Sequence, residues 1–478
     1  MARTENDRVV QVGEAPGGGG TLDRFFGISG RGSSVRTEVL AGITTWLTMA
    51  YILFVNPQFL AGIPDSAGTQ LGFAEVLTVT ALVAGVASIA MGLWANYPFA
   101  IAAGLGLNGF VAFTLVGGLG LTWPQAMGVI VVEGLIITGL VVTGFREAVL
   151  NAIPMDLKRS IGIGIGLFLA IIGFVNGGIV VPGPGATKPV DLNANLASLR
   201  ILVFVVGLAL AAILVAKRVK GGLLLAIVGT TIFAMIVNIG WGDKGIWNAV
   251  GPGIAQFPDK VVAAPDFSIV GNFNFGVFGA IGFAAAAAAI IAVMLSDFFD
   301  TMGTAVGLGE EAGLLDEDGK LPGMNRVLLV DSLAAAGGGA ASASSNTTYI
   351  ESGSGIGEGG RTGLVAVVVG VLFLLAMFFS PIAGIIPQEA TAPVLIIVGY
   401  FMMRNIGQID WRDPAIGIPC LLTMTLMPYT YSITNGVGAG FLSYTVIKVL
   451  QGKARDVHPL LYIVSAVFAW YFFHGLLA

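Results

Sequence analysis

Four acidic residues lie inside stretches of the chain that otherwise contain mainly apolar and small residues. Asp297 and Asp300 stand in AIIAVMLSDFFDTMGTAV, Asp331 in VLLVDSLAAAGGG and Glu351 in SSNTTYIESGSGIG. If these stretches cross a lipid bilayer, each charge costs at least about 2.5–3.5 kcal/mol at the centre of a helix. Acids kept at that depth mark a binding site or a proton pathway, so the pattern predicts a transporter.

The composition places the chain among membrane proteins. Hydrophobic residues make up 55% of the 478 residues and charged residues only 11%, against about 25% charged residues in soluble domains. A span takes about 20 apolar residues, so a dozen or more spans can be accommodated. The net charge of −5 says little about partners, and we expect no nucleic-acid partner. With one cysteine, Cys420, and two histidines, His458 and His474, we expect no disulfide, metal cluster or other cofactor.

Hydrophobic runs predict an all-α polytopic membrane protein with 14 transmembrane segments. The expected spans cover residues 38–56, 73–94, 98–115, 122–143, 155–176, 197–216, 220–239, 285–307, 325–341, 343–358, 362–380, 389–406, 412–431 and 433–450. We expect the protein in the inner or plasma membrane, with its N-terminus in the cytoplasm. Nearly all of the 23 basic residues then lie on the cytoplasmic side, as the positive-inside rule requires. Those left outside are Lys188, Arg200, Lys244 and Lys260. The final helix, HPLLYIVSAVFAWYFFHGLL, is either a further span or lies along the cytoplasmic surface.

The spans form two sets of seven that resemble each other. In the fifth span of each set, Pro154 aligns with Pro387 and Gly166 with Gly399. Because seven is odd, the second set enters the membrane upside down, and such 7+7 inverted repeats are typical of alternating-access carriers. We divide the chain into a cytosolic N-terminal tail (1–37), a first seven-span repeat (38–240), an extracytoplasmic linker (241–274), a second repeat (275–452) and a C-terminal apolar helix (453–478).

The third span of each set is too short and too rich in glycine for a simple helix. A run compatible with a β-strand (98–103 or 344–349) precedes a glycine cluster that can open a half-helix. Broken backbone at membrane depth needs protein, water or ligand partners. Gly104, Gly106, Gly353 and Gly355 would let a flat ligand approach the backbone closely.

Some of these features have plainer explanations. GLGLNG and GIGEGG fit G-x-G-x-x-G, but no soluble βαβ unit surrounds either, so we do not expect dinucleotide binding. A single small residue in a span is more often a packing contact than a ligand contact.

The acids have alternatives too. Asp297 and Asp300 share one helix face, and either can simply pair with a buried base or hydroxyl, although no Lys or Arg falls in the interior of a predicted span, away from its ends. Asp331 is either a site residue or is satisfied by Ser332 or a helix end, and Glu133 can be a structural hydrogen-bonding partner. The acids at span ends, Glu75 and Glu389, should be solvated.

Several long motifs make the chain similar to a known family. It resembles the adenine/guanine/hypoxanthine permeases, nucleobase–cation symporters with the fold of the bacterial uracil transporter. The matching stretches are DRFFGISGRGSSVRTEVLAGITTWLTMAYILFVNP, SDFFDTMGT, LLDEDGKLP, TTYIESGSGIGEGGRTGL, FFSPIAGIIPQEATAPVLIIVG and MPYTYSITNGVGAGFLSY. The resemblance runs from about residue 23 to the end.

The resemblance implies roles for individual residues. Glu351 would bind the N–H edge of a purine, Asp297 would be the second substrate carboxylate, and both would couple to protons. Asn108 would complete recognition or steady Glu351. The other expected contributors are Gly106 and Ile350 at the substrate, and Asp300, Thr301, Asp331 and Ser354 in support.

The resemblance also implies how the protein would work. A core domain (spans 1–4 and 8–11) would move against a gate domain (spans 5–7 and 12–14) in an elevator-type alternating-access cycle. Two copies can pair through the gate side as a homodimer. Two departures alter the shell of the site: the third-span motif lacks the usual proline and tyrosine, and Asn346 stands where the family has an apolar residue.

Three alternatives to a purine carrier stay open. The chain could be a related uracil or xanthine carrier, or a carrier of an inorganic anion, which should place a basic residue near the half-helices. A membrane-embedded enzyme would need a nucleophile–base pair or a metal cluster, and neither stands out in the sequence. A channel is the third, but interrupted spans in inverted repeats favour a gated carrier.

Overall fold

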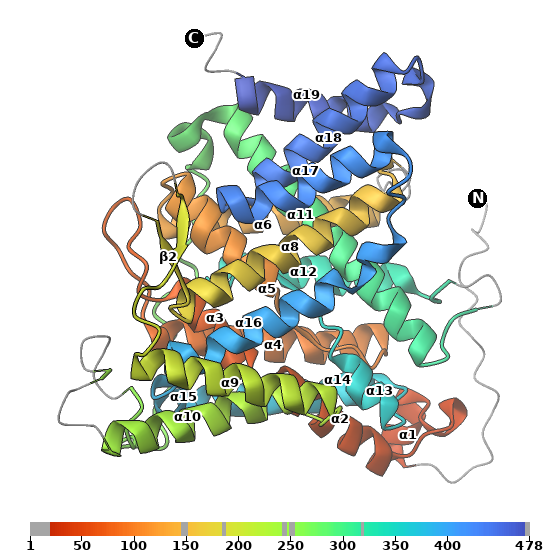
Figure 1. The fold of residues 1–478 in the computed structure, drawn as a ribbon. Helices are drawn as coiled ribbons and strands as arrows, with labels where there is room; N and C mark the ends of the chain where they lie inside the picture. The colour runs from red at the N-terminus through yellow and green to blue at the C-terminus, as the bar shows by residue number, and fades with distance from the viewer. Residues whose placement is uncertain are drawn as a thin grey trace.

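The computed structural model describes residues 20–144, 152–183, 188–240, 246–247, 254–316 and 320–473. Within them the chain is almost entirely helical, with two pairs of short strands (Figure 1). In this part of the chain, 10 helical segments are long and apolar enough to cross a membrane. They are Val35–Leu60, Phe73–Ala95, Trp123–Val142, Met155–Asn176, Leu199–Ala216, Gly222–Gly240, Val277–Glu311, Gly363–Gly384, Gln388–Gln408 and Ile433–Leu450.

Four of the predicted spans are not among these helices. Two of them, α12 (Met324–Ala340) and α17 (Pro414–Thr430), are helices of 17 residues each. The other two are the interrupted segments around residues 98–115 and 343–358. The count of 14 spans and their inverted repeat therefore stay predictions.

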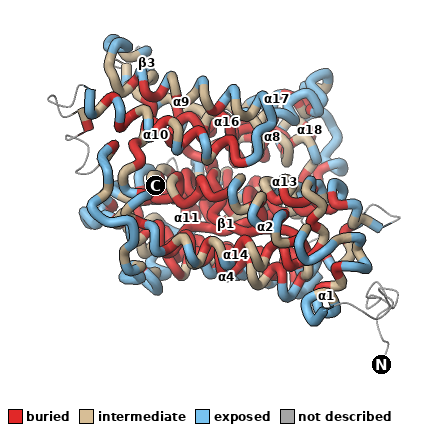
Figure 2. The backbone as a smooth tube through the Cα atoms, turned by 90° about the horizontal axis from the view of Figure 1, so that it is seen from below, coloured by how far each residue is buried: buried red, intermediate tan, exposed pale blue. Residues whose placement is uncertain are grey.

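The long helices form two layers (Figure 2). What we call the core layer contains α2 (Val35–Met49), α3 (Ile52–Leu60), α4 (Phe73–Ala90), α6 (Trp123–Val142), α11 (Val277–Glu311), α12 and α14 (Gly363–Ala376). The gate layer contains α8 (Met155–Asn176), α9 (Leu199–Ala216), α10 (Gly222–Gly240), α16 (Gln388–Met403), α17 and α18 (Ile433–Leu450). In the core layer α14 packs on α2 and α4, and α6 packs on α11 and α12; in the gate layer α8 packs on α16 and α17. The long helices of predicted spans 1, 2, 4, 8, 9 and 11 thus lie in one layer and those of spans 5–7 and 12–14 in the other, while the core and gate domains stay a prediction.

Both interrupted spans contain a short strand, and the two strands pair. Strand β1 (Ile101–Ala103) runs antiparallel to β4 (Asn346–Thr348). Each strand leads into a short helix, α5 (Leu105–Gly109) after β1 and α13 (Ser352–Gly357) after β4. Because every residue of both strands is buried, the pairing satisfies backbone groups that no water can reach.

Short elements connect the long ones. They are α1 (Thr21–Phe26), η1 (Ser29–Arg31), η2 (Met91–Ala95), η3 (Phe110–Gly118), β2 (Val180–Pro182), β3 (Val190–Leu192), η5 (Met377–Phe379), α15 (Ser380–Gly384), η6 (Arg404–Gln408), η7 (Ala454–Asp456) and α19 (Pro459–Phe473). Residues 1–19 of the expected tail lie outside the described residues. Phe26 and Ile28, also assigned to the tail, pack against Leu364 of α14, so the end of that segment belongs to the folded core layer.

Glycines allow the helices to approach closely. A Cβ on Gly166 of α8 would lie 2.7 Å from the carbonyl oxygen of Gly399 in α16, and one on Gly399 would lie 2.4 Å from the Gly166 oxygen. Any side chain at either position would therefore separate the helices. These are the two glycines that align between the predicted repeats, and each lies against the backbone of the other.

The predicted linker, where it is described, is tied to both layers. The Ala255 amide donates to the Ile385 carbonyl ahead of α16 at 2.8 Å, and the Gly271 amide donates to Ala340 at the end of α12 at 2.8 Å. After the linker, α11 bends at Gly282, whose φ of 78° favours glycine.

The last described helix is short. Helix α19 has 15 residues and packs on α18 and α11. At 1.5 Å per residue it is about 22 Å long, shorter than a hydrocarbon core of about 30 Å.

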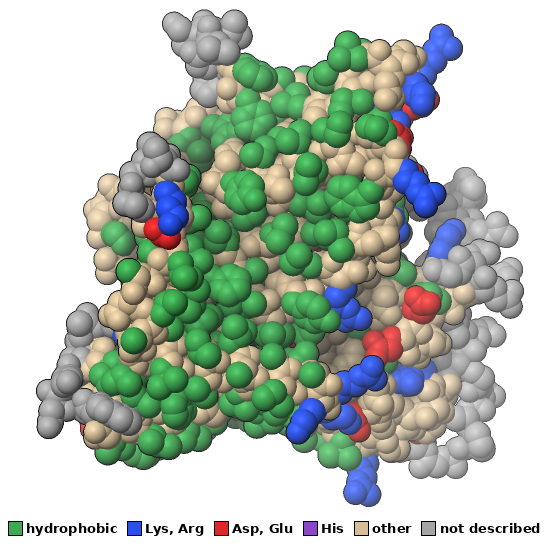
Figure 3. All heavy atoms as spheres, viewed as in Figure 1, with side chains coloured by type: hydrophobic (Ala, Val, Ile, Leu, Met, Phe, Trp, Pro, Cys, Tyr) green, Lys and Arg blue, Asp and Glu red, His purple; other side chains and the backbone are tan. Residues whose placement is uncertain are grey.

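Charge is distributed unevenly over the surface. In the view of Figure 3, hydrophobic side chains cover most of the face, and Lys and Arg side chains gather at one edge. This arrangement suits a protein embedded in lipid with a basic side. The cytoplasmic position of the N-terminus stays a prediction.

Candidate functional site

Glu351 lies where β4 gives way to α13, inside an interrupted span. Its side chain is half-buried, and Oε1 accepts a hydrogen bond from the Tyr51 hydroxyl. Ser354 Oγ donates to the Glu351 carbonyl at 2.5 Å and also bonds Thr48 Oγ1 at 2.7 Å. Among the described side chains, the Tyr51 hydroxyl is the donor to this carboxylate, and it bonds Oε1 and not Oε2.

Asp297 of α11 and Glu133 of α6 share one hydroxyl group. Ser345 Oγ lies 3.1 Å from Asp297 Oδ2 and 3.4 Å from Glu133 Oε2. Both side chains are completely buried. Within the described part of the chain, Asp297 Oδ1 and Glu133 Oε1 have no hydrogen-bond donor. These two carboxyl groups are therefore buried without a full set of partners.

Asp331 of α12, by contrast, is well satisfied. Its Oδ1 accepts from the Thr348 amide and hydroxyl, each at 2.7 Å, and its Oδ2 accepts from Thr301 Oγ1 at 2.7 Å. Thr301 in turn bonds Thr347 Oγ1 at 2.6 Å. Asp331 therefore fixes β4 against α11 and α12, through Thr301 and the strand and not through Ser332 or a helix end.

Asp300 and Ile350 are accessible, unlike the buried acids. The Asp300 side chain is exposed, and so are Gly303 and Gly307 on the same face of α11. No atom lies within 4 Å of a Cβ placed on either glycine, so a ligand or water can approach this face. Asp300 is in electrostatic range of both Glu351 and Asp297. Ile350, at 56% exposure, is adjacent in sequence to Glu351.

The third-span residues face both layers. Asn108 in α5 is completely buried, and neither polar atom of its amide has a partner among the described residues. A Cβ on Gly106 would lie 2.3 Å from Ile165 Cγ2 of gate helix α8. Gly106 is therefore a point of close approach between the layers.

The structure thus brings some predicted site residues together and separates others. Asp297, Asp300 and Thr301 lie on α11 and Asp331 on the adjoining α12. Within the described residues, Glu351 instead bonds Tyr51, Thr48 and Ser354. Sequence reasoning missed Tyr51 and Ser345, and it took Glu133 only as structural.

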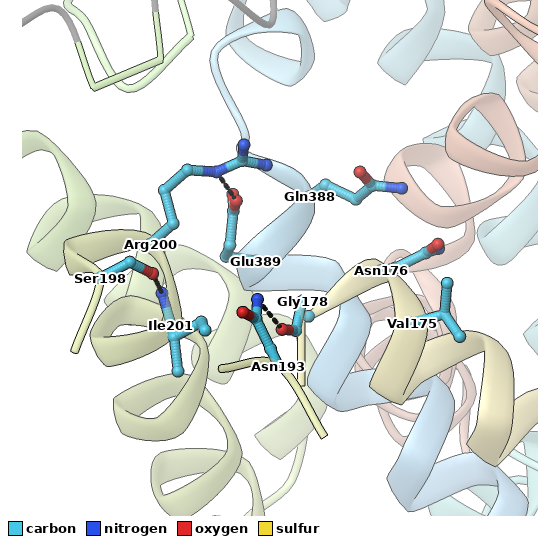
Figure 4. Close-up of a pocket in the computed structure, with 10 residues that line it drawn as sticks. Val175, Asn176, Gly178, Asn193, Ser198, Arg200, Ile201, Gln388 and Glu389 are labelled. Carbon is cyan, nitrogen blue, oxygen red and sulfur yellow. Dashed lines mark hydrogen bonds and ion pairs between the residues drawn. The ribbon is translucent and has the colours of Figure 1, made fainter. Parts of the chain in front are cut away.

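A cavity lies elsewhere, where α9, α16 and the end of α8 meet. It has a volume of about 260 Å³ and is lined by residues such as Asn176, Asn193 and Gln388 (Figure 4). Here Glu389 is 2% exposed, pairs with Arg200 and accepts from Trp247 Nε1 at 3.0 Å. The expectation that Glu389 is solvated is wrong, because Arg200 in the first turn of α9 and Trp247 after α10 both bond its carboxyl group at the start of α16.

Comparison with known proteins adds a sequence match over most of the chain. Residues 36–454 match the model of the Permease family, Xan_ur_permease. The chain belongs to this family. It is 39% identical over 455 residues to the adenine permease AdeP of Escherichia coli, covering 94% of this chain and 96% of the permease. It is also 39% identical over 456 residues to the guanine/hypoxanthine permease PbuG of Bacillus subtilis, covering 94% and 99%.

A solved structure agrees with the fold. The transmembrane domain of a cyanobacterium bicarbonate transporter, BicA, superposes with a TM-score of 0.57 at 14% identity, over 85% of this chain and 97% of BicA. At that identity the likeness concerns architecture alone. The family and its members make this multi-pass membrane protein a permease and not an enzyme, in a family with nucleobase-transporting relatives.

Proposed function

We propose that this permease imports purine nucleobases (hypoxanthine, guanine or adenine) by symport with protons. The observation that carries the proposal is the near full-length likeness to both an adenine permease and a guanine/hypoxanthine permease. The two relatives are equally similar, so the preferred purine is left to experiment.

The site has the chemistry that a purine needs. A purine is flat, uncharged and edged with N–H groups and ring nitrogens. Glu351 Oε2 can accept an N–H bond in a charge-assisted interaction, the stronger kind. The Asn108 amide, unpartnered in the described structure, can both donate to a ring nitrogen and accept from an N–H group.

The two layers suit an elevator-type motion, which is part of the proposal. The paired strands and the acids belong to the core layer, while Gly106 touches Ile165 of the gate layer. Moving the core layer as a unit would carry the bound purine past α8 without breaking the strand pair. Pairing of two copies through the gate side stays a prediction.

A carrier for an inorganic anion fits less well. Asp297, Asp331, Glu133 and Glu351 all come from elements of one region and would repel an anion. Uracil or xanthine remains an alternative substrate, since both offer N–H edges to a carboxylate.

The test is uptake and counterflow in vesicles that contain the purified protein. Labelled hypoxanthine should exchange with unlabelled purines from a panel of bases, and a protonophore should abolish its accumulation. One proton moving through about 100 mV supplies ~2.3 kcal/mol, which is roughly fifty-fold accumulation at tenfold per 1.4 kcal/mol. Uptake that ignored both pH and the protonophore would reject proton coupling.

A variant tests the binding residue. Glu351→Ala should abolish transport, and Glu351→Gln should retain weak binding, because its amide oxygen still accepts an N–H bond. Uptake at the wild-type level by the alanine variant would remove Glu351 from the site.

A further inference from the structure

We propose that Glu133 and Asp297 hold the transported proton together, bridged by Ser345. This inference rests on the proposed proton-coupled function and assigns the coupling step to a pair that includes Glu133. The motivating observation is that two completely buried carboxyl groups contact one hydroxyl and each retains an unpartnered oxygen within the described structure.

Hydrogen-bond counting requires a proton in this cluster. A serine hydroxyl has one hydrogen to donate, and an ionised carboxylate has none. Ser345 can therefore donate to Asp297 or to Glu133, but not to both. The second contact becomes a hydrogen bond only if one carboxyl group is protonated and donates. The two carboxyl groups are also within hydrogen-bonding reach of each other, so a single proton can serve both.

The charged groups that act on the pair are acids. Helix α6 packs on α12, α11 and η3. Facing the pair are Asp331 from α12 and Asp300 from α11, and η3 has no titratable residue. Arg326 of α12 is exposed at the start of its helix. On the other helices that pack on α11, Lys158 of α8 has its Nζ 5.2 Å from the centre of the Phe299 ring, and Lys448 of α18 pairs with Asp413 at 3.8 Å. Two adjacent anions in this setting repel each other without relief, so the pair retains one proton.

Ser345 connects the Glu133–Asp297 pair to the interrupted spans. The Gly104 amide, at the start of α5, donates to the Ser345 carbonyl at 2.9 Å, and Ser345 directly precedes β4. Loss of the proton leaves two anions competing for one hydroxyl, which favours movement of Ser345 and of the strand pair attached to it. Proton binding and the arrangement of α5 and α13 are thus mechanically linked.

The variant Glu133→Gln tests whether proton coupling can be lost while substrate exchange is kept. In vesicles, this variant should still exchange labelled hypoxanthine for unlabelled hypoxanthine, since Glu351 and Asn108 are intact. Accumulation driven by a pH gradient should fall from at least tenfold to no accumulation, and exchange should lose its dependence on pH. Glu310→Gln, which neutralises an exposed acid at the end of α11, is the matched control and should accumulate hypoxanthine like wild type. Gradient-driven accumulation by Glu133→Gln with the wild-type pH profile would overturn the proposal.

A spectroscopic measurement keeps the inference testable without any substrate. Infrared difference spectra during a pH titration should show the carbonyl stretch of a buried protonated carboxyl group in wild type and in Glu310→Gln. Glu133→Gln should lack its titration, and Ser345→Ala should displace its midpoint. An unchanged titration in both variants would refute the shared proton. If wild type shows the band but transports no purine, the proposed substrate fails while the proton pair stands. The Ser345→Ala result decides the matter alone if Glu133→Gln does not fold.

Discussion

Removing one hydroxyl group should test whether Tyr51 positions Glu351 for substrate. Tyr51 is 1% exposed and its ring belongs to the core cluster, so Tyr51→Phe keeps the packing and deletes only the donor to Glu351 Oε1. A hydrogen bond to a charged group contributes about 1.5–3 kcal/mol. Because Glu351 is only half-buried, water can partly replace the lost donor, and we expect the lower end of this range.

The expected result is a weaker complex with an intact fold. A loss of about 1.5 kcal/mol corresponds to roughly a tenfold higher Kd for the purine at 1.4 kcal/mol per tenfold. Isothermal titration calorimetry of the purified protein would measure this Kd, and initial uptake rates in vesicles would show a matching rise in the half-saturating concentration. Thermal unfolding of the unliganded protein would show whether the fold is maintained.

Tyr349→Phe is the matched control. Tyr349 is also buried, at 6% exposure, but its hydroxyl donates to the Ala103 carbonyl at 2.5 Å and not to Glu351. This variant should lose about 0.5–1.5 kcal/mol of folding stability and keep its affinity for purines. An unchanged Kd in a folded Tyr51→Phe protein, or an equal loss of affinity in both variants, would refute the positioning role.

Three further substitutions test the contact between the layers at Gly106 and the structural roles of Asp331 and Glu389. Gly106→Ala puts a Cβ within 2.3 Å of Ile165 Cγ2, so it should slow uptake severely without lowering expression. Adding Ile165→Ala should restore part of the uptake rate, and an unaffected rate in Gly106→Ala would contradict close approach of the layers at this point. Asp331→Asn turns one acceptor into a donor that faces other donors, so thermal unfolding should show a loss of about 1–3 kcal/mol; an unchanged melting temperature would mean that Asp331 is not an anchor. Glu389→Ala should lower the folding stability by about 1–3 kcal/mol, at the low end because the Arg200 side chain is 40% exposed. It should leave purine selectivity unchanged, so altered selectivity would mean that this region takes part in substrate recognition.

Local sequence patterns were enough to predict the interrupted segments. A glycine-rich run between apolar spans weakens helix formation wherever it occurs, and acids in apolar surroundings stand out without any knowledge of their neighbours. The strands at Ile101–Ala103 and Asn346–Thr348 fall within the predicted runs. The identity of Asp331 as an anchor was left open because its partners, Thr301 and Thr348, lie on other elements.

Contacts between distant segments could not be predicted in the same way. Tyr51 and Glu351 are 300 positions apart, and Glu133 and Ser345 are 212 apart; taken singly, a tyrosine or serine in a span looks like an ordinary core residue. Glu389 seemed solvated because it stands at a predicted span end, and only the folded chain brings Arg200 and Trp247 to it. These residues depend on how the layers assemble, and one sequence carries no record of that.

The partners of each acid suggest why the protein keeps so many of them in one region. Asp331 is buried and accepts three hydrogen bonds, so both of its oxygens are satisfied and it holds β4 in place. Glu351 has one donor and an accessible oxygen, so a substrate can complete its hydrogen bonds. Glu133 and Asp297 have neither enough donors nor access to water. Two carboxylates within reach of each other, with charges about 4 Å apart, repel by about 4 kcal/mol at an effective dielectric constant of about 20, so only a proton can satisfy them. Amide substitutions should therefore have three different effects: loss of stability at Asp331, loss of affinity at Glu351, and loss of proton coupling at Glu133.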